Sequence, residues 1–183
     1  MSESKKSPAS GGNGEDNGKT PQTQPEKKAK RAKPKINLNR VDMPKQAPEV
    51  RRHNFDEVAT GYTYEMAMEE ARRCIQCKKR NCQEGCPVSI DIPGFIHHLQ
   101  ENDIEGASQV LKRKTSLPGI CGRVCPQELQ CELACTLNKK GAPIAIGRLE
   151  RYIADWERAE GATSLPEIAA PTGKKVAVVG TGP

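Results

Sequence analysis

Apolar side chains recur every three or four residues through most of the chain from residue 63 to residue 161, which is the spacing of one helix face. Thr63 is placed to cap the first helix, and Glu65 lies in its first turn. The apolar face of this helix consists of Tyr64, Met68 and Ala71. The pattern therefore predicts that the central part of the chain is mostly α-helical.

Later segments repeat the pattern. Asp91 can cap a second helix that has Pro93 in its first turn, and Asp103 can cap a third. A short helix is expected over residues 127–137, and the longest helix runs from residue 144 and stops at Gly161. The apolar stripes of the long helices are Phe95, Ile96 and Leu99; Ile104, Ala107, Val110 and Leu111; and Ile146, Leu149, Ile153 and Trp156. We expect one helical domain over residues 36–161.

The pattern changes at residue 174. The segment "KKVAVVGTGP" contains an apolar run typical of a buried parallel strand, and Gly180 and Gly182 follow it at once. A strand entering a glycine-rich turn is the beginning of a Rossmann-type domain, where the glycines form a tight turn and admit a pyrophosphate. We interpret residues 162–173 as a linker and residues 174–183 as the start of an FAD- or NAD(P)-binding domain. The sequence is then the front of a longer protein.

Charge is concentrated at the other end. Residues 1–35 carry nine Lys and Arg against four Asp and Glu, and almost nothing apolar. Such a segment cannot offset its chain entropy, so we expect a disordered basic tail. No apolar run approaches the ~18 residues of a membrane span, and no signal peptide is visible. We therefore expect a cytoplasmic protein with no membrane partner, in which thiols stay reduced.

Eight cysteines form two groups. The first is C-x2-C-x4-C-x3-C-P, with Cys74, Cys77, Cys82 and Cys86, and the second is C-x3-C-P-x5-C-x3-C, with Cys121, Cys125, Cys131 and Cys135. Eight thiols match the ligand count of two 4Fe–4S clusters. In two-cluster ferredoxins the cysteine before the proline ligates the other cluster, and Cys-Pro occurs in both groups here. The spacing thus favours a crossed arrangement.

Zinc and disulfides are the alternatives. Structural zinc sites usually show paired C-x2-C knuckles, but only one such pair is present, and the three histidines lie outside the cysteine groups. Disulfides do not suit a reducing compartment. A zinc-binding interaction module with a basic arm for nucleic acid stays open as a hypothesis. It is not favoured, because aromatic residues that could stack on bases make up only 3% of the chain.

Four stretches carry a resemblance to a known family. They are "RRHNFDEVATGYTYEMAMEEARRCIQCKKRNCQEGCPVSIDIPGFI", "GICGRVCPQELQCELACTL", "IAIGRLERYIADW" and "VAVVGTGP". From about residue 40 onward the chain resembles the N-terminal part of the small (β) subunit of NADPH-dependent glutamate synthase, and it is similar to the N-terminal domain of dihydropyrimidine dehydrogenase. The resemblance implies a helical domain with two 4Fe–4S clusters, fused to a downstream domain that binds FAD and NADPH.

The same resemblance implies a ligand set. One cluster takes Cys74, Cys77, Cys82 and Cys135, and the other takes Cys86, Cys125, Cys131 and an oxygen ligand from the "LER" stretch. We choose Glu150 for that position, because a carboxylate can ligate iron and the guanidinium of Arg151 is a poor candidate. Cys121 is then a bystander. The competing count, in which Cys121 ligates and Glu150 is a helix-surface acid, stays open.

The leading hypothesis is an electron-transfer domain of an NADPH-dependent glutamate synthase. NADPH would reduce the flavin, and the clusters would pass electrons to a large subunit that forms glutamate from glutamine and 2-oxoglutarate. A pyrimidine-reducing or ferredoxin-NADP bifurcating oxidoreductase could use the same module. We expect an oligomer in the full protein. The present chain alone lacks most of a flavin site, so it is not expected to complete a hydride transfer.

Overall fold

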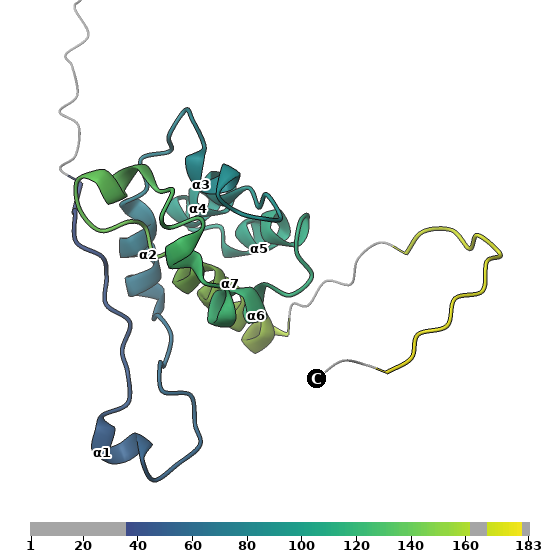
Figure 1. The fold of residues 1–183 in the computed structure, drawn as a ribbon, viewed down its shortest axis with the longest axis horizontal. Coiled ribbons are helices and arrows are strands. Elements are labelled where there is room, and N and C mark those ends of the chain that lie inside the picture. Colours follow the sequence, from purple (N-terminus) through teal and green to yellow (C-terminus); the bar gives the residue numbers. More distant parts are fainter. Residues whose placement is uncertain (1–35, 162–167, 181–183) are drawn as a thin grey trace, which may run out of the picture. The chain divides into compact units, whose positions relative to one another are not determined.

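The computed structural model of the chain describes residues 36–161 and 168–180 (Figure 1). Residues 36–161 fold into a body made of helices and loops, without a β-sheet among the described residues. Its elements in chain order are α1 (Pro48–Arg51), α2 (Tyr64–Arg72), α3 (Asn81–Glu84), α4 (Ile92–Gln100), α5 (Ile104–Lys112), α6 (Pro118–Val124), the 3₁₀ turns η1 (Gln127–Leu129) and η2 (Thr136–Lys139), and α7 (Ile146–Glu160). The predicted mostly helical class is confirmed.

The three predicted N-caps are present. The Thr63 side chain accepts a hydrogen bond from the Met66 amide, 3.3 Å away. Asp91 and Asp103 accept from the amides three residues ahead of them, at 3.1 and 2.8 Å. At the other end of the body, Gly161 has a φ of 64°, a left-handed conformation that suits glycine and ends α7. These boundaries were predictable because caps act within one turn of the chain.

The core lies where α2, α4, α5 and α7 pack on one another. The expected stripes of α4 and α5 are buried apart from Ile104, and Leu149 and Ile153 of α7 are fully buried. In α2 the prediction was partly wrong, because Tyr64 is exposed and its hydroxyl bonds to Asn102 at 3.1 Å. The buried face of α2 instead consists of Ala67, Met68, Ala71 and the charged Glu70.

The predicted helix over residues 127–137 was wrong. That stretch forms η1, a series of turns and the first part of η2, while the unpredicted helix α6 lies just before it. The backbone is extended at both Cys125 and Cys135, which separates the thiols from any continuous helix. The segment bends at its cysteines, so it forms no continuous helix. The helical spacing of its apolar residues therefore does not correspond to a helix face.

Helix α6 forms because it packs closely on α7, along the lower part of the body in Figure 1. A Cβ built on Gly122 would lie 2.6 Å from the backbone nitrogen of Arg151, closer than real Cβ atoms approach. Only glycine therefore lets the two helices come this close at that point. Two glycines in seven residues weaken the sequence signal for a helix, so tertiary packing rather than intrinsic propensity accounts for α6.

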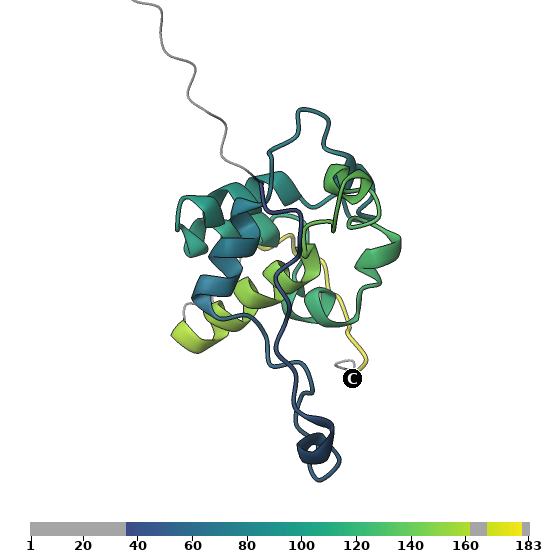
Figure 2. The ribbon, with the colours of Figure 1, turned by 90° about the vertical axis from the view of Figure 1, so that its left-hand side faces the viewer.

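A hairpin-like extension, residues 44–60, leaves the helical body and carries α1 at its tip (Figures 1 and 2). Its two sides are joined by backbone hydrogen bonds from Gln46 to Val58 and from Thr60 to Pro44, at 2.8 and 3.0 Å. The side chains of Gln46 and Asn54 also bond to each other across the extension. The paired backbone makes this a defined element rather than a loose loop.

The expected strand at 176–179 is not formed. Residues 168–180 contain no strand, and the side chains of Val176, Val178 and Val179 are exposed. A strand is completed by hydrogen bonds to neighbouring strands, and the described residues offer it no partner. The predicted basic tail, the first half of the linker (162–167) and Gly182 lie outside the described residues. Within them, no helix is both long enough and apolar enough to cross a bilayer.

Candidate metal centre

The first thiol group gathers at the end of α2. Cys74 lies just past that helix, Cys77 lies in the loop before α3, and Cys82 lies within α3. Cys135, from far along the chain, directly precedes η2. All four line one cavity, together with apolar side chains of which Ile92, Ile96 and Ile146 are examples. Folding therefore brings together the four cysteines that the resemblance assigned to one cluster.

Burial raises the pKa of Cys74 to about 12 and that of Cys82 to about 11. The neighbouring thiols add to both shifts: Cys82, Cys135 and Cys77 act on Cys74, and Cys135 and Cys77 act on Cys82. The four sulfur atoms are thus mutual electrostatic neighbours in a poorly solvated site. The raised pKa values keep the Cys74 and Cys82 thiols protonated on their own, so binding a metal cluster as thiolates requires these two to release protons.

Two glutamines shape the loop that holds this group. Gln76, between Cys74 and Cys77, has a φ of 48°, in the left-handed region that non-glycine residues rarely adopt. The Gln100 side chain, at the end of α4, donates to the carbonyls of Ala71 and Cys74 at 2.9 Å each and contacts the Gln76 side chain at 3.2 Å. The bend that separates the two cysteines is therefore held from outside by α4.

The second thiol group consists of Cys86, Cys125 and Cys131. Burial raises the pKa of Cys131 to about 12, and the charges of Glu132, Cys86 and Cys125 raise it further. The pKa of Cys125 is raised by burial first, and then by Cys121, Glu150 and Cys86. No cysteine of the first group is among the main causes of either pKa shift. Cys86 thus sits with the later cysteines, although it lies only four residues after Cys82.

Glu150 is an anomalous side chain in this second group. It is only 5% exposed, and its Oε1 atom is buried without a hydrogen-bond partner in the structure. Burial alone raises the pKa of its carboxyl to about 7. A buried carboxylate that nothing satisfies is costly, and native proteins tolerate one mainly where it has a function. Its charge acts on Cys125, so the orphaned oxygen lies beside the second thiol group.

Cys121 is a neighbour of the same group with a different environment. It lies within α6, one helical turn before Cys125, and its Sγ is 3.8 Å from the Thr115 hydroxyl. Its backbone carbonyl accepts a hydrogen bond from Gln127 at 2.7 Å. The structure therefore places both candidates for the fourth position, Glu150 and Cys121, within electrostatic reach of Cys125.

An ion-pair network fixes α6 against α7 beside this group. Arg123, between Cys121 and Cys125, contacts both carboxylate oxygens of Asp155 at 2.8 and 2.9 Å and also pairs with Glu57 of the extension. Arg151, next to Glu150, is buried and donates to Glu57 at 3.0 Å and to the Ala59 carbonyl at 2.9 Å. The Arg151 guanidinium is thus occupied by these contacts.

The residues present fit iron–sulfur clusters. The first group offers four cysteines around a partly enclosed, apolar cavity. The second offers three neighbouring cysteines and a buried oxygen without a partner. Among the described residues, no three His, Cys, Asp or Glu side chains close around one single metal ion. A 4Fe–4S cluster does not need such a site. Each of its ligands binds a different iron at a different corner of the cubane, so the ligands lie farther apart than around a single ion.

Several residues that build the site escaped the sequence reasoning. Glu70 of α2 and Arg73, which follows that helix, are both almost fully buried and form an ion pair at 2.5 Å. Glu70 also accepts from the amides of Val41 and Ala145, at 2.8 and 2.7 Å. Arg73 donates to four carbonyls, those of Asn37, Leu38, Ala142 and Pro143. The pair thereby ties the entering chain and the loop before α7 to the end of α2, just before Cys74.

A second pair supports the same loop. Arg40 pairs with the buried Glu132, which follows Cys131, and also donates to the carbonyls of Pro143 and Ile144. Glu132 accepts in turn from the Gly147 amide at 3.3 Å. Nothing in the sequence marks these acids as buried, since neighbouring charged residues of the same type are exposed. Only the i, i+3 spacing of Glu70 and Arg73 indicated that those two could pair.

Residues 51–162 match the protein family described as dihydropyrimidine dehydrogenase domain II, 4Fe-4S cluster. Together with the helical fold and the eight cysteines, the match defines a helical iron–sulfur domain. The chain belongs to this family, since the match covers more than half of its length.

Curated relatives agree with this assignment. The chain is 38% identical over 148 residues to the glutamate synthase [NADPH] small chain of Escherichia coli (strain K12), and 37% identical over 148 residues to that of Halomonas elongata. It is 35% identical over 129 residues to the NAD-dependent dihydropyrimidine dehydrogenase subunit PreT of Escherichia coli (strain K12). These matches cover 81%, 81% and 70% of the present chain. Two of these relatives are named as glutamate synthase small chains and the third as a dihydropyrimidine dehydrogenase subunit.

The chain covers only 31% of the length of each of these three relatives. The matched part is the region that carries the two cysteine groups. What the comparisons show for this chain is therefore a 4Fe–4S domain, similar to a part of these longer relatives.

Proposed function

We propose that this chain carries electrons through two 4Fe–4S clusters within an NADPH-dependent flavoprotein oxidoreductase of the glutamate synthase type. The observation that carries the proposal is the sorting of the cysteines into two separate groups that each draw on both halves of the sequence. The relatives named as glutamate synthase small chains, with the highest coverage of the three compared, support this substrate class.

For the first cluster we propose the ligands Cys74, Cys77, Cys82 and Cys135. For the second we propose Cys86, Cys125, Cys131 and Glu150, with Cys121 as the alternative to Glu150. The unpartnered buried oxygen of Glu150 supports the carboxylate, since a cluster iron would give it the partner that the protein lacks. Each cluster, when bound, takes up and releases one electron. The protein's own contribution is to hold the thiolates apart at two sites and to keep water from both.

FAD and NADPH would be bound by a downstream domain, which Gly180 and Gly182 would begin. Gly180 has a φ of 82°, a conformation that glycine adopts readily, and this suits the tight turn proposed for it. A large subunit or an equivalent acceptor would receive the electrons in a glutamate synthase. The similarity to PreT supports pyrimidine reduction as the second candidate, because that relative is named for a dihydropyrimidine dehydrogenase.

A reductive titration tests the electron-transfer role. The chain, reconstituted with iron and sulfide under anaerobic conditions, is expected to accept about two electrons from dithionite, one for each cluster. Its broad visible absorption should bleach and return fully on reoxidation by air-free ferricyanide. A preparation that holds both clusters yet takes up no electrons at any potential down to about −700 mV, the lower end for such clusters, would contradict the proposal.

A further inference from the structure

The cavity of the first thiol group is bordered by positive charge. Lys78 and Lys79 lie in the loop between Cys77 and Cys82, and Lys139 and Lys140 lie at the end of η2, four and five residues after Cys135. All four side chains are exposed, and Lys79 itself lines the cavity. We refer to these four lysines as the basic rim.

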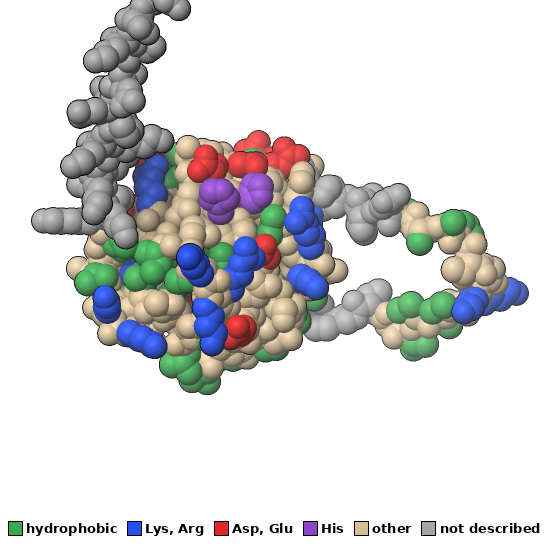
Figure 3. Space-filling model, turned by 90° about the horizontal axis from the view of Figure 1, so that it is seen from above, with side chains coloured by type: hydrophobic (Ala, Val, Ile, Leu, Met, Phe, Trp, Pro, Cys, Tyr) green, Lys and Arg blue, Asp and Glu red, His purple; other side chains and the backbone are tan. Residues whose placement is uncertain are grey.

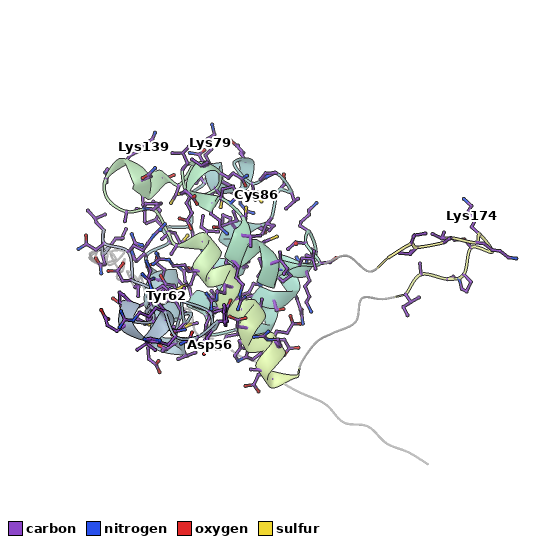
Figure 4. The ribbon with its side chains drawn as sticks, turned by 60° about the horizontal axis from the view of Figure 1, so that its bottom comes forward. Asp56, Tyr62, Lys79, Cys86, Lys139 and Lys174 are labelled. Carbon is purple, nitrogen blue, oxygen red and sulfur yellow. The ribbon has the colours of Figure 1, made fainter. Side chains whose placement is uncertain are left out.

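The two halves of the rim lie together because their loops touch. The Cys77 Sγ is 3.3 Å from the Thr136 hydroxyl, which joins the first loop to η2. Lys79 and Lys139 extend from the same side of the body, away from its interior (Figure 4). The four lysines therefore lie on two loops that touch each other, and Lys79 places them beside the cavity of the first thiol group.

No carboxylate in these stretches offsets the rim. Residues 71–83 and 133–149, which contain all four lysines, have no Asp or Glu. Arg80 in the same loop pairs with Asp91 at 2.7 Å, but none of the four lysines forms an ion pair with any other described residue. In the face seen in Figure 3, Lys and Arg side chains are spread over one part while acidic side chains gather along an edge.

The second thiol group has the opposite surroundings. The charges that act on Cys125 and Cys131 include Glu128, Glu132 and Glu150. Its surface is also apolar, with exposed side chains at Ile120, Val124, Leu129 and Leu133. Of the two sites, the first thus has the positive border. A generally basic chain does not explain this difference, because residues 36–183 carry a net charge of only +1.

We infer that the basic rim is the docking surface for the acidic face of a separate protein electron carrier, which exchanges electrons with the first cluster. This inference rests on the proposed function. Electron-transfer encounters bury small surfaces and depend on charge steering, which raises the association rate without tight binding. Lysines that point into solvent around a redox centre are suited to that task. A nucleic acid is the less suitable partner, because no exposed aromatic side chain lies in the rim to stack on bases.

The experiment mixes the oxidised, cluster-loaded chain with a reduced plant-type [2Fe–2S] ferredoxin, an acidic carrier, in a stopped-flow instrument. One electron passes from the ferredoxin, which is oxidised, to a 4Fe–4S cluster of the chain, which is reduced. Because charge attraction is screened by salt, the second-order rate constant should fall at least about tenfold between roughly 10 and 300 mM salt. In the reverse direction, one electron passes from the reduced chain, which is oxidised, to ferricytochrome c, a basic carrier, which is reduced; this rate should not fall with salt.

Charge reversal assigns the effect to the rim. The variant Lys78→Glu/Lys79→Glu/Lys139→Glu/Lys140→Glu should lose at least about tenfold in rate at low salt and lose the salt dependence. The control Arg51→Glu/Arg52→Glu reverses two exposed charges at the end of α1, outside both thiol groups. It should change the rate by less than about twofold. If the reversal variant does not hold its iron, the four Lys→Gln changes provide the same comparison with a smaller loss.

The outcomes separate the two proposals. If the clusters accept electrons from dithionite but the ferredoxin rate is independent of salt and of the rim, the rim proposal is wrong and the electron-transfer proposal stands. If no redox-active cluster forms, the proposed function itself fails. A third outcome would overturn the inference: single-stranded DNA binds the chain but not the reversal variant, and the rate of electron transfer from ferredoxin is the same in both. The rim would then bind nucleic acid.

Discussion

Replacing Cys125 by alanine is expected to leave the chain with about four of its about eight irons, because the second cluster loses a ligand that no neighbour replaces. Replacing Cys121 by alanine is expected to keep both clusters. The two residues lie one turn apart, and both affect the electrostatics of the same thiol group, so they form a matched pair. The Cys121→Ala change also preserves the backbone hydrogen bond that Gln127 makes to that residue.

Glu150→Ala completes this comparison and should also remove about four irons. The change is not expected to unfold the protein by itself, because it removes a buried carboxyl oxygen that has no hydrogen-bond partner in the structure. Iron and acid-labile sulfide are measured for all three variants after the same anaerobic reconstitution. Loss of about four irons in Cys121→Ala, with none lost in Glu150→Ala, would show that the thiol is the ligand and the carboxylate is not.

The largest effect on stability is expected at Glu70. Glu70→Ala should lower the free energy of unfolding by about 3–5 kcal/mol, because it leaves the charge of Arg73 buried without its partner. The change also removes the acceptor of the Val41 and Ala145 amides. Urea unfolding of the cluster-loaded protein, followed by far-ultraviolet circular dichroism, measures the difference as a shift of the midpoint.

The control for this variant is Glu69→Ala. Glu69 is the preceding residue of the same helix, but its side chain is exposed, so its removal should change the free energy of unfolding by less than about 0.5 kcal/mol. A Glu70→Ala protein as stable as the Glu69→Ala protein would mean that the buried pair does not hold the entering chain and the loop before α7 in place.

The helix starts of the body were predictable from sequence because they depend on short-range chemistry. Thr63, Asp91 and Asp103 each satisfy a backbone amide three residues ahead, so a local pattern contains the whole interaction. Helix α6 was not predictable in this way. Its glycines are unfavourable for an isolated helix, and the reason for Gly122 is the backbone of Arg151, which lies 29 residues later in the sequence.

The candidate site likewise has a part that the sequence predicted and a part that it did not. Cysteine spacing and the two Cys-Pro pairs suggested that the groups cross, because ligand chemistry restricts which residues can take part. The cysteine pattern did not indicate which other residues hold the cysteine loops in place. Glu70, Arg73, Arg40 and Glu132 are charged residues that a sequence reading assigns to the surface, and only the folded chain shows that they cross-link the loops around the thiols. Gln100 likewise acts on the Cys74 loop from another helix.

The central claim is that the stretch "CIQCKKRNCQEGCP" serves two clusters, with Cys82 in one and Cys86 in the other. The iron content of Cys82→Ala, Cys86→Ala and the double variant, measured after identical anaerobic reconstitution, tests it most directly. The crossed arrangement predicts about four irons in each single variant and almost none in the double variant, since each change removes a different cluster. About four irons in all three variants would contradict it, because both cysteines would then belong to the same cluster.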